Sequence, residues 1–494
     1  MPATAHELKC LVRSFQPIVV IETVEEERVD DLLAVVAADL RLPYYQWTVT
    51  DGLHRHGGSG AFEGTAPVPG LVQFLREQPT EGIFHLKDFA AHLDNAATAR
   101  AMREVAQRFS RSSSVLVITG TAVELPRELA ALAVRLELEL PNRDELRALV
   151  QATLQSLSRS GQVAIELERG DGRALLDALT GLTAAQARHV LAYVILEDGR
   201  LDGADVRKVL DRKREILEGG GLLDYYPPED GAWEIGGFRT LKAWLDRAKI
   251  GYTAAARSMN LTPPRGILVV GVQGCGKSLA AKFIARQWKL PLLKLDGARL
   301  YDKYVGETEK NLRRAISVAE SMAPAVLWID EIEKVFAEAS SSEYDGGLSR
   351  RIFGAFLTWL QEKKKNVFVV GAANDLFSVP PELLRKGRFD EIFFVDLPDA
   401  GEREEIFRIH LRLRNQDPDG YDIARAAAAS EAFSGAEIEQ VVIGSLYRAL
   451  HGKRTPSTEL LLEEIKATVP LAVSRREDIE RIRETAKGRF VNVR

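Results

Sequence analysis

The chain of 494 residues contains only two cysteines, Cys10 and Cys275, which are too few for a disulfide framework or a cysteine-based metal site. We therefore expect a reducing, cytoplasmic location. No uninterrupted apolar run of about 18 residues occurs, and the first residues lack an apolar signal core, so the sequence predicts no membrane-spanning helix and no secretory signal.

An excess of positive charge is also missing. Lys and Arg number 66 against 71 Asp and Glu, which gives a net charge of −5 and no general attraction for nucleic acids or anionic membranes. No tract of interleaved basic and aromatic residues argues for a DNA or RNA partner. The chain length predicts about three domains, each large enough for its own core.

What the sequence does contain is a phosphate-binding loop at residues 271–278, which reads Gly-Val-Gln-Gly-Cys-Gly-Lys-Ser. An apolar strand is predicted at 266–270 and a helix at 279–288, which is the context that this pattern requires. Its backbone N–H groups are expected to surround a phosphate chain, with Lys277 at the terminal phosphates of ATP and the Ser278 hydroxyl on Mg²⁺. The expected nucleotide contacts here are Gly271, Gly274, Cys275, Gly276, Lys277, Ser278 and Leu279. Cys275 is interpreted as a small filler, with a redox-sensitive thiol as the alternative.

Two further apolar strands end in polar side chains. The strand at 325–329 is followed by Asp330 and Glu331, and the strand at 366–373 by Asn374. In a buried parallel sheet these ends face the nucleotide. We expect Asp330 to hold Mg²⁺ through water, Glu331 to deprotonate the attacking water, and Asn374 to hold that water or sense the γ-phosphate.

Arg385 and Arg388 follow, three residues apart, before a last strand at 391–396. An arginine near a γ-phosphate stabilises transition-state charge, and a neighbouring subunit can supply it. The pair therefore predicts a homo-oligomer. From 401 onwards the pattern is helical.

Taken in order, these features make residues 233–494 resemble an AAA ATPase module. Ile235 and Gly236 are similar to the adenine-contacting turn of such modules, and Gly435 and Ala436 lie in a segment similar to the lid motif near base and ribose. The phrases at 326–332 and 384–398 resemble most the single-module AAA proteins of cyanobacteria and algal plastids and their bacterial relatives. The resemblance implies a three-layer P-loop NTPase fold with a helical lid, ATP and Mg²⁺ as cofactors, and a ring of six subunits. Ala436 stands where more distant ATPases of this fold place a sensing arginine, which leaves the arginines of a neighbouring subunit as the main sensors.

The first half of the chain repeats this order of strands without the chemistry. Apolar strands are predicted at 17–21, 42–52, 82–89, 114–119 and 136–141, but the first is followed by Glu25-Glu26-Glu27 instead of a glycine-rich loop. Three carboxylates there would repel phosphate. Lys87-Asp88 replaces Asp330-Glu331, which we interpret as loss of the water-activating carboxylate.

The predicted fold class is therefore α/β, an AAA module preceded by a degenerate AAA-like domain that binds no nucleotide. The alternative for the first half is a generic α/β domain. The predicted boundaries are 1–215 for the degenerate domain with its helical lid, 216–232 for a linker, 233–398 for the large ATPase subdomain and 399–494 for its helical lid.

One triplet bears on what the ATPase acts on. Tyr304, Val305 and Gly306 resemble the first pore loop of ring-forming AAA translocases, whose aromatic side chains grip a polypeptide. The alternative is an aromatic residue packed under the ring surface. A polar loop at 337–347 is expected as the second pore loop, although it lacks gripping residues. We therefore expect a protein remodeller acting on an unidentified protein partner, with an ATP-dependent assembly switch or docking scaffold as the alternative.

Overall fold

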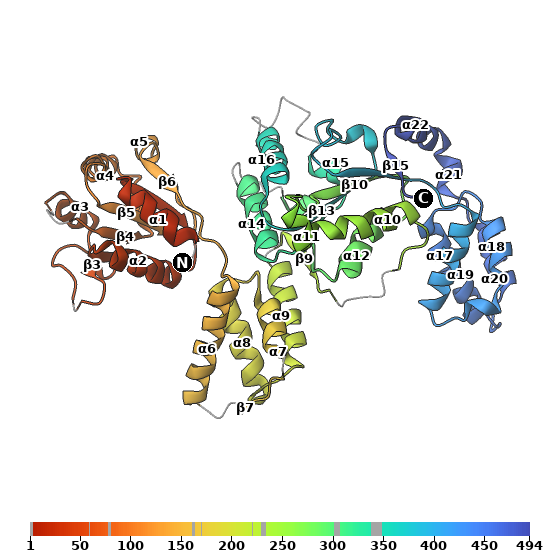
Figure 1. Cartoon of the computed structure of the whole chain (residues 1–494), viewed down its shortest axis with the longest axis horizontal. Coiled ribbons are helices and arrows are strands. Elements are labelled where there is room, and N and C mark those ends of the chain that lie inside the picture. The colour runs from red at the N-terminus through yellow and green to blue at the C-terminus, as the bar shows by residue number, and fades with distance from the viewer. Residues whose placement is uncertain are drawn as a thin grey trace. The chain divides into compact units, whose positions relative to one another are not determined.

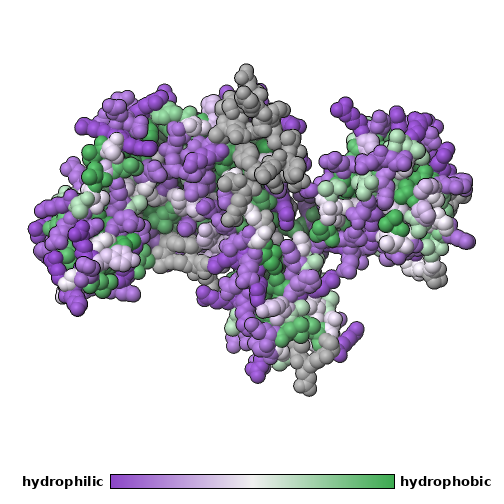
Figure 2. Space-filling model, turned by 180° about the vertical axis from the view of Figure 1, so that it is seen from behind, coloured by the Kyte–Doolittle hydropathy of each residue, from purple (hydrophilic) through white to green (hydrophobic). Residues whose placement is uncertain are grey.

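The structure, a computed structural model, describes residues 3–58, 60–77, 81–160, 164–168, 170–219, 221–228, 234–300, 307–336 and 348–494. The chain divides into two compact units (Figure 1). The first unit comprises residues 1–163 and 182–199, and the second comprises 164–181 and 200–494. Within the described residues, no helix is both long and apolar enough to cross a membrane. On the face seen in Figure 2, hydrophilic side chains cover most of the surface, and apolar ones appear in scattered groups.

The second unit contains a seven-stranded sheet with the order β15-β14-β10-β13-β12-β11-β9. Neighbouring strands are parallel except β9, which pairs antiparallel with β11. The central strands are buried along their length, as expected for a parallel sheet covered on both faces. The strands are β9 (Leu223–Tyr226), β10 (Gly266–Gly271), β11 (Leu292–Leu295), β12 (Ala325–Ile329), β13 (Val367–Ala373), β14 (Glu391–Val395) and β15 (Val491–Asn492).

Alternate residues of β10 enter two separate apolar cores, one on each face of this sheet. Ile267 and Val269 pack in the core with helices α10 and α12, whereas Leu268 and Val270 pack in the core with α14, α15 and α16. This arrangement confirms the predicted three-layer α/β fold. The helices are α10 (Arg239–Ala248), α12 (Lys277–Trp288), α14 (Glu307–Ser321), α15 (Ile332–Val335) and α16 (Leu348–Glu362), with the short elements η2 (Lys249–Tyr252), α11 (Ala254–Ser258), α13 (Gly297–Leu300) and η4 (Leu376–Ser378).

A bundle of helices follows the sheet and has an apolar core of its own. It contains α17 (Ala400–Arg412), η5 (Pro418–Gly420), α18 (Ile423–Ala429), α19 (Gly435–His451) and α20 (Thr458–Ala467), and α21 (Leu471–Ser474) and α22 (Arg476–Ala486) come after it.

The end of the chain differs from the expected all-helical lid over 399–494, because β15 returns to the large sheet and pairs with β14. Val493 is buried there, and the guanidinium of Arg483 binds Asp396 at 2.8–3.0 Å. These contacts tie the last helix and strand to the seven-stranded sheet.

The expected linker at 216–232 also differs. Helix α9 (Asp205–Gly219) extends into it, and Leu223–Tyr226 forms β9 at the edge of the seven-stranded sheet. Leu223 and Tyr225 are almost completely buried, and Asp224 between them is half-buried. This alternation is the pattern of an edge strand, and the neighbouring glycines and prolines obscured it in the sequence.

The first unit contains a six-stranded sheet with the order β3-β2-β4-β5-β1-β6. Its five parallel strands β6-β1-β5-β4-β2 follow the same order as β14-β10-β13-β12-β11 of the seven-stranded sheet, which confirms the predicted repeat. Two strands differ from the expectation: β6 lies at 133–135 instead of 136–141, and β3 is an added antiparallel strand. The strands are β1 (Ile18–Glu22), β2 (Tyr44–Thr48), β3 (Gly52–Arg55), β4 (Ile83–Lys87), β5 (Val115–Gly120) and β6 (Ala133–Arg135).

Helices cover both faces of this sheet and have separate apolar cores. On one face lie α1 (Ala3–Arg13) and α2 (Glu26–Leu40), and on the other α3 (Val68–Glu77) and α4 (Ala96–Phe109), with η1 (Phe89–His92) and α5 (Arg127–Ala130).

The helices that follow this sheet are divided between the units. Helices α6 (Arg143–Ser160) and α8 (Ala184–Asp198) fall in the first unit. Helices α7 (Asp171–Leu179) and α9, with the short strands β7 (Ala164–Ile165) and β8 (Arg200–Leu201), fall in the second. The predicted boundary at residue 215 therefore does not coincide with the division between the two units.

Candidate nucleotide site

The polar motifs of the second unit converge because of the order of its strands. Strand β13 lies between β10 and β12, and all three run parallel. The carboxyl end of β10 carries the loop at 271–276, that of β13 carries Asn374, and that of β12 carries the pair Asp330-Glu331. The sheet thus brings the three predicted groups to one edge, where open α/β sheets bind ligands.

The loop after β10 has three glycines with positive φ, Gly271, Gly274 and Gly276. Gly271 has φ 142°, and a Cβ there would lie 2.0 Å from the carbonyl oxygen of Val395. Gly276 has φ 90° and is the left-handed residue immediately before α12. The loop therefore turns sharply into the N-terminus of α12, whose free N–H groups and dipole favour a phosphate.

Lys277 is buried inside this loop. Its Nζ donates hydrogen bonds to the carbonyl oxygens of Gly271 at 3.0 Å and Val272 at 2.8 Å. Burial lowers the pKa of Lys277 to about 8, and nearby acidic groups, including Glu333 and Asp330, partly oppose that shift. The same ammonium is the group expected to bind the terminal phosphates, so a bound nucleotide would compete with the two loop carbonyls for it.

Ser278 and Asp330 form the expected metal side of the site. The Ser278 Oγ donates to both carboxylate oxygens of Asp330, at 3.3 and 3.4 Å. One hydroxyl and one carboxylate fit Mg²⁺, which prefers oxygen ligands and usually keeps several waters and phosphate oxygens. Within the described ranges, no group of three or more His, Cys, Asp and Glu side chains could hold a metal ion.

Glu331 and Asn374 form the expected catalytic side. Asn374 Nδ2 donates to Glu331 Oε1 at 3.3 Å, across neighbouring strand ends. Glu331 has a left-handed backbone (φ 48°) and immediately precedes α15. Lys334, one turn later, places its Nζ 2.9 Å from each Glu331 oxygen. The carboxylate is 40% exposed, so solvent reaches the group that is expected to activate water.

The expected adenine side lies against the same loop. A Cβ at Gly276 would lie 3.6 Å from Phe238 and 3.8 Å from Ile235, both of which are buried. Gly236, which follows Ile235, lies against helix α17, since a Cβ added at Gly236 would be 3.0 Å from the Ile406 side chain. The turn at 235–238 is thus packed between the phosphate loop and the lid.

The lid reaches the loop through the N-terminus of α19. Ala436 donates its N–H to the carbonyl oxygen of Gly274 at 2.9 Å, and Gly435 lies beside the same oxygen. Ser434 caps the helix in a reciprocal capping box with Glu437. The predicted lid residues therefore meet the predicted phosphate loop directly.

Leu279 and Cys275 both pack against the apolar core beside α12. Burial raises the pKa of the Cys275 thiol to about 12, and the positive charge of Lys277 only partly opposes this shift. A thiolate is the reactive form of cysteine, so this environment favours the filler interpretation of Cys275 over the redox-sensitive one.

Two predicted groups are not brought into this edge. Arg385 is exposed and makes no side-chain hydrogen bond or ion pair with any described residue, whereas half-buried Arg388 donates to the Leu357 carbonyl at 3.3 Å. Their expected role on a neighbouring subunit stays a prediction. Residues 304–306 and the polar loop at 337–347 lie outside the described residues.

Glu333 is a residue of the site that sequence reasoning missed. It is 3% exposed, and its Oε1 accepts the N–H of Asn374 at 3.0 Å and of Asp375 at 3.4 Å. The only signal in the sequence is that an acidic residue stands two positions after Glu331. Without the fold, such a residue is expected on the solvent-exposed side of a helix.

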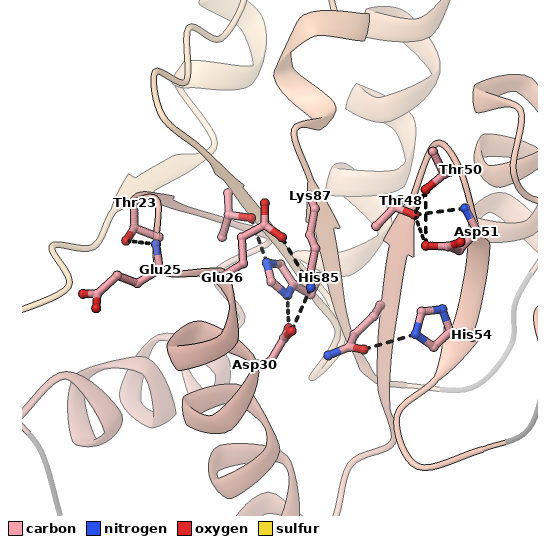
Figure 3. A network of polar contacts seen from close by, with 12 residues as sticks. Thr23, Glu25, Glu26, Asp30, Thr48, Thr50, Asp51, His54, His85 and Lys87 are labelled. Carbon is pink, nitrogen blue, oxygen red and sulfur yellow. Dashed lines mark hydrogen bonds and ion pairs between the residues drawn. The ribbon is translucent and has the colours of Figure 1, made fainter. Parts of the chain in front are cut away.

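The corresponding edge of the first unit carries different groups (Figure 3). Lys87, where Asp330 is expected, places its Nζ 2.7 Å from Asp30 and 3.6 Å from Glu26. His85 lies between Asp30 and Thr119, with 2.8 Å to each. An ion-paired lysine and a buried histidine thus replace the hydroxyl–carboxylate pair of the ATPase site.

One interpretation of this edge was wrong. Asp88 has φ 53° and precedes η1, just as Glu331 has φ 48° and precedes α15. A carboxylate is therefore retained at the position of Glu331, one methylene shorter. What the first unit lacks is the phosphate loop and the carboxylate that corresponds to Asp330.

Three family models match the chain. Residues 267–397 match the ATPase family associated with various cellular activities (AAA). Residues 4–138 match the N-terminal domain of SpoVK-like AAA ATPases, and residues 144–220 match their second domain.

Whole-length relatives point to the same family. The chain is 36% identical over 469 residues to an uncharacterised AAA domain-containing protein, ycf46, of Trieres chinensis, covering 94% of this chain and 93% of the relative. It is 36% identical over 487 residues to ycf46 of Guillardia theta, covering 98% and 94%. The similarity to a Cell division cycle protein 48 homolog of Archaeoglobus fulgidus is 30% over 326 residues, covering 62% and 44%. The chain therefore belongs to the AAA ATPase family.

Proposed function

We propose that this protein is an ATP-hydrolysing AAA ring protein that remodels a protein partner or translocates it through a central pore. The observation that carries the ATPase part is the pairing of Ser278 with Asp330 and of Glu331 with Asn374 at one sheet edge, beside the phosphate loop. Membership of the AAA family implies nucleotide binding, typically with Mg²⁺, and ATP hydrolysis in general.

Each side chain has a role that follows from its position. The N–H groups of the loop and Lys277 would bind the phosphates, and Ser278 with Asp330 would hold the ion, which would neutralise phosphate charge. Glu331 accepts a proton from the attacking water, and the amide of Asn374, 3.3 Å away, orients that water against the carboxylate. Ile235 and Gly236 on one side, and the start of α19 on the other, would enclose the base and ribose.

Ring assembly is proposed because hydrolysis needs an arginine near the γ-phosphate, and none of the described residues at the chain's own sheet edge supplies one. Arg385 is exposed and unpaired among the described residues, so it is available to a neighbouring copy. A transition-state arginine contributes about 10³–10⁵ in rate. We propose six copies from the family's ring architecture, and a cytoplasmic location from the scarcity of cysteine.

The assembly is tested by mixing chains. ATPase activity per chain should rise with protein concentration, and Arg385→Ala added to the native chain should lower activity by more than its share of the mixture. Lys386→Ala, also exposed and adjacent, is the matched control and should only dilute the activity. Full activity from a strictly monomeric sample would contradict the ring.

Action on a protein is proposed from the Tyr304-Val305-Gly306 triplet. An unfolded polypeptide should stimulate ATP hydrolysis, and Tyr304→Ala should remove that stimulation. The Glu331→Gln chain, loaded with ATP, should retain its partner for identification by mass spectrometry. Stimulation that survives Tyr304→Ala would instead favour the assembly switch, in which ATP builds a platform and slow hydrolysis releases it.

The first unit supports the second candidate in one respect. It keeps the AAA-like strand order but has no glycine-rich loop after its first strand. It is therefore suited to binding a partner and not to hydrolysing ATP. We propose it as the docking or regulatory surface for the partner in either scheme.

A further inference from the structure

We infer that Glu333 is a positioning residue for ATP hydrolysis, which sets the distance between the catalytic carboxylate of Glu331 and the water-orienting amide of Asn374. This inference rests on the proposed ATPase function and concerns the same site. It assigns a role to a buried acid that none of the expected motifs includes.

The geometry of Glu333 joins two neighbouring strand ends. The residue lies in the four-residue helix α15, directly after Asp330 and Glu331 at the end of β12. Its Oε1 accepts two consecutive backbone N–H groups, from Asn374 at 3.0 Å and Asp375 at 3.4 Å, just beyond the end of β13. One carboxylate oxygen therefore holds the segment that carries Asn374 against the segment that carries Glu331.

These two N–H groups need a partner because both strands end here. Strand β13 stops at Ala373, so the amides of Asn374 and Asp375 are beyond its sheet pairing. A buried backbone N–H without an acceptor is rare and unfavourable. Glu333 supplies that acceptor, and the short helix η4 then begins at Leu376 with Asp375 as its cap.

The burial of Glu333 indicates a purpose beyond local pairing. The side chain is 3% exposed, and its Oε2 has no hydrogen-bond partner within the described part of the chain. Burial raises the pKa of Glu333, and the backbone N–H groups oppose that shift. Burying a carboxyl group whose second oxygen has no hydrogen-bond partner is energetically unfavourable. A neutral side-chain carbonyl could accept the same two backbone N–H groups without that penalty.

The consequence for catalysis follows from the distance between the side chains of Asn374 and Glu331. Asn374 Nδ2 and Glu331 Oε1 are 3.3 Å apart, at the long end of a hydrogen bond. A shift of about 1 Å in a catalytic group can reduce turnover about 10²-fold. Releasing the Asn374 backbone would permit such a shift without changing any group that contacts the phosphates.

Steady-state ATPase kinetics on the full-length chain tests this role. Glu333→Ala should lower kcat about 10- to 100-fold and change the KM for ATP by less than about threefold. Glu333→Gln keeps an acceptor oxygen and should restore most of kcat. Glu320→Ala is the matched control. It also removes a partly buried carboxylate, which accepts a hydrogen bond from Trp359, and it lies away from the site, so kcat should stay native.

A second readout does not depend on turnover. Hydrogen exchange of the Asn374 and Asp375 amides should accelerate in Glu333→Ala and remain slow in Glu333→Gln and Glu320→Ala. If native protein hydrolyses ATP but Glu333→Ala has native kcat, the inference is wrong while the ATPase stands. Slow exchange in Glu333→Ala would also overturn it. A native chain without ATPase activity would remove the proposed function and this role together, whatever the exchange shows.

Discussion

The two sheets of this protein have the same order of parallel strands but different first loops. In the ATPase sheet five residues, 272–276, separate β10 from α12, whereas in the first unit three residues, 23–25, separate β1 from α2. The shorter loop has no glycine and cannot form a cradle of inward N–H groups. The strand order depends on apolar layers that both units retain, and the chemistry depends on a few loop residues that only one retains.

The helix that meets the first loop shows the contrast most directly. In the ATPase module, Ala436 at the start of α19 donates its N–H to a loop carbonyl of Gly274. In the first unit, Ala184 at the start of α8 donates its N–H to the carboxylate of Glu25 at 2.6 Å. Thr183 caps α8 in a reciprocal box, as Ser434 caps α19.

The first unit thus carries a negative group of its own where the ATPase module would receive a phosphate. The Glu25 side chain is only 7% exposed, and Arg28 lies 3.5 Å from it. A carboxylate at a helix N-terminus is stabilised by the free N–H groups and the helix dipole. The difference teaches that a degenerate module can keep its lid in contact by replacing the ligand with a side chain.

The largest expected effect separates the two units by nucleotide binding. The full-length chain should bind one ATP, and Lys277→Ala should remove nearly all of that binding, because the loop loses its only ammonium group. Calorimetric titration with Mg-ATP measures the stoichiometry. Lys87→Ala, at the corresponding edge of the first unit, is the control and should still bind one ATP. A Lys277→Ala chain that still bound one ATP at micromolar concentration would show that the first unit is a nucleotide site.

The next effect distinguishes Glu331 from Asp88, the two acidic residues with a left-handed backbone at corresponding positions. Glu331→Gln should bind ATP and lose hydrolysis by about 10²–10⁴, because the general base becomes a neutral amide. Asp88→Asn changes the residue with the same backbone conformation in the first unit and should leave turnover unchanged. Single-turnover hydrolysis of labelled ATP measures both. Native turnover in Glu331→Gln would exclude this assignment.

Much of the ATPase site was predictable from the sequence because its motifs are local. The loop at 271–278, the pair Asp330-Glu331 and Asn374 each end a recognisable apolar strand, and a parallel sheet brings such ends together. The repeat of strand order in the first half was predictable for the same reason. The apolar period of a buried strand survives the loss of its catalytic residues.

Other features depend on long-range packing and left weak local signals. Leu223–Tyr226 forms β9 only because β11 presents an open edge, and Val491–Asn492 forms β15 only because β14 does. The hydrogen bond from the Asn374 N–H to Glu333 joins residues 41 positions apart in the sequence. The equivalence of Asp88 to Glu331 lies in their shared left-handed backbone, which the sequence does not display.

A smaller effect concerns the contact between Glu25 and α8. Glu25→Ala should destabilise the first unit by about 1.5–3 kcal/mol, because a buried charged acceptor is lost and the N–H groups of α8 are left without it. Glu27→Ala is the matched control, since that side chain is 86% exposed and only faces Arg188 at 3.4 Å. It should change stability by less than about 0.5 kcal/mol. Hydrogen exchange of the α8 amides measures both, and equal effects would show that Glu25 has no special role.

The smallest effect is a pH dependence that belongs to the first unit alone. His85 is completely buried, and burial lowers its pKa below the ordinary value, although the hydrogen bond to Asp30 opposes this. A neutral ring explains the two shortest contacts: Nδ1–H donates to Asp30, and Nε2 accepts from the Thr119 hydroxyl. The Tyr44 hydroxyl also lies 3.2 Å from Nδ1. The ATPase edge has no histidine among its described site residues, so it should not share this dependence.

The sign follows from which state binds the proton. Below pH 6.5 the unfolded chain protonates this histidine and the folded chain does not, so stability falls with decreasing pH, by at most about 1.4 kcal/mol per unit. Burial alone would raise the pKa of Asp30, but hydrogen bonds from His85, Lys87 and Tyr44 lower it. The stability that Asp30 contributes is therefore lost only in stronger acid.

Exchange of the β4 and β5 amides should therefore accelerate between pH 6.5 and 5.5 relative to those of β10 and β13. His85→Gln should abolish that difference, whereas His189→Gln, an exposed histidine of the same unit, should preserve it. A difference that persists in His85→Gln would assign the pH dependence to another group.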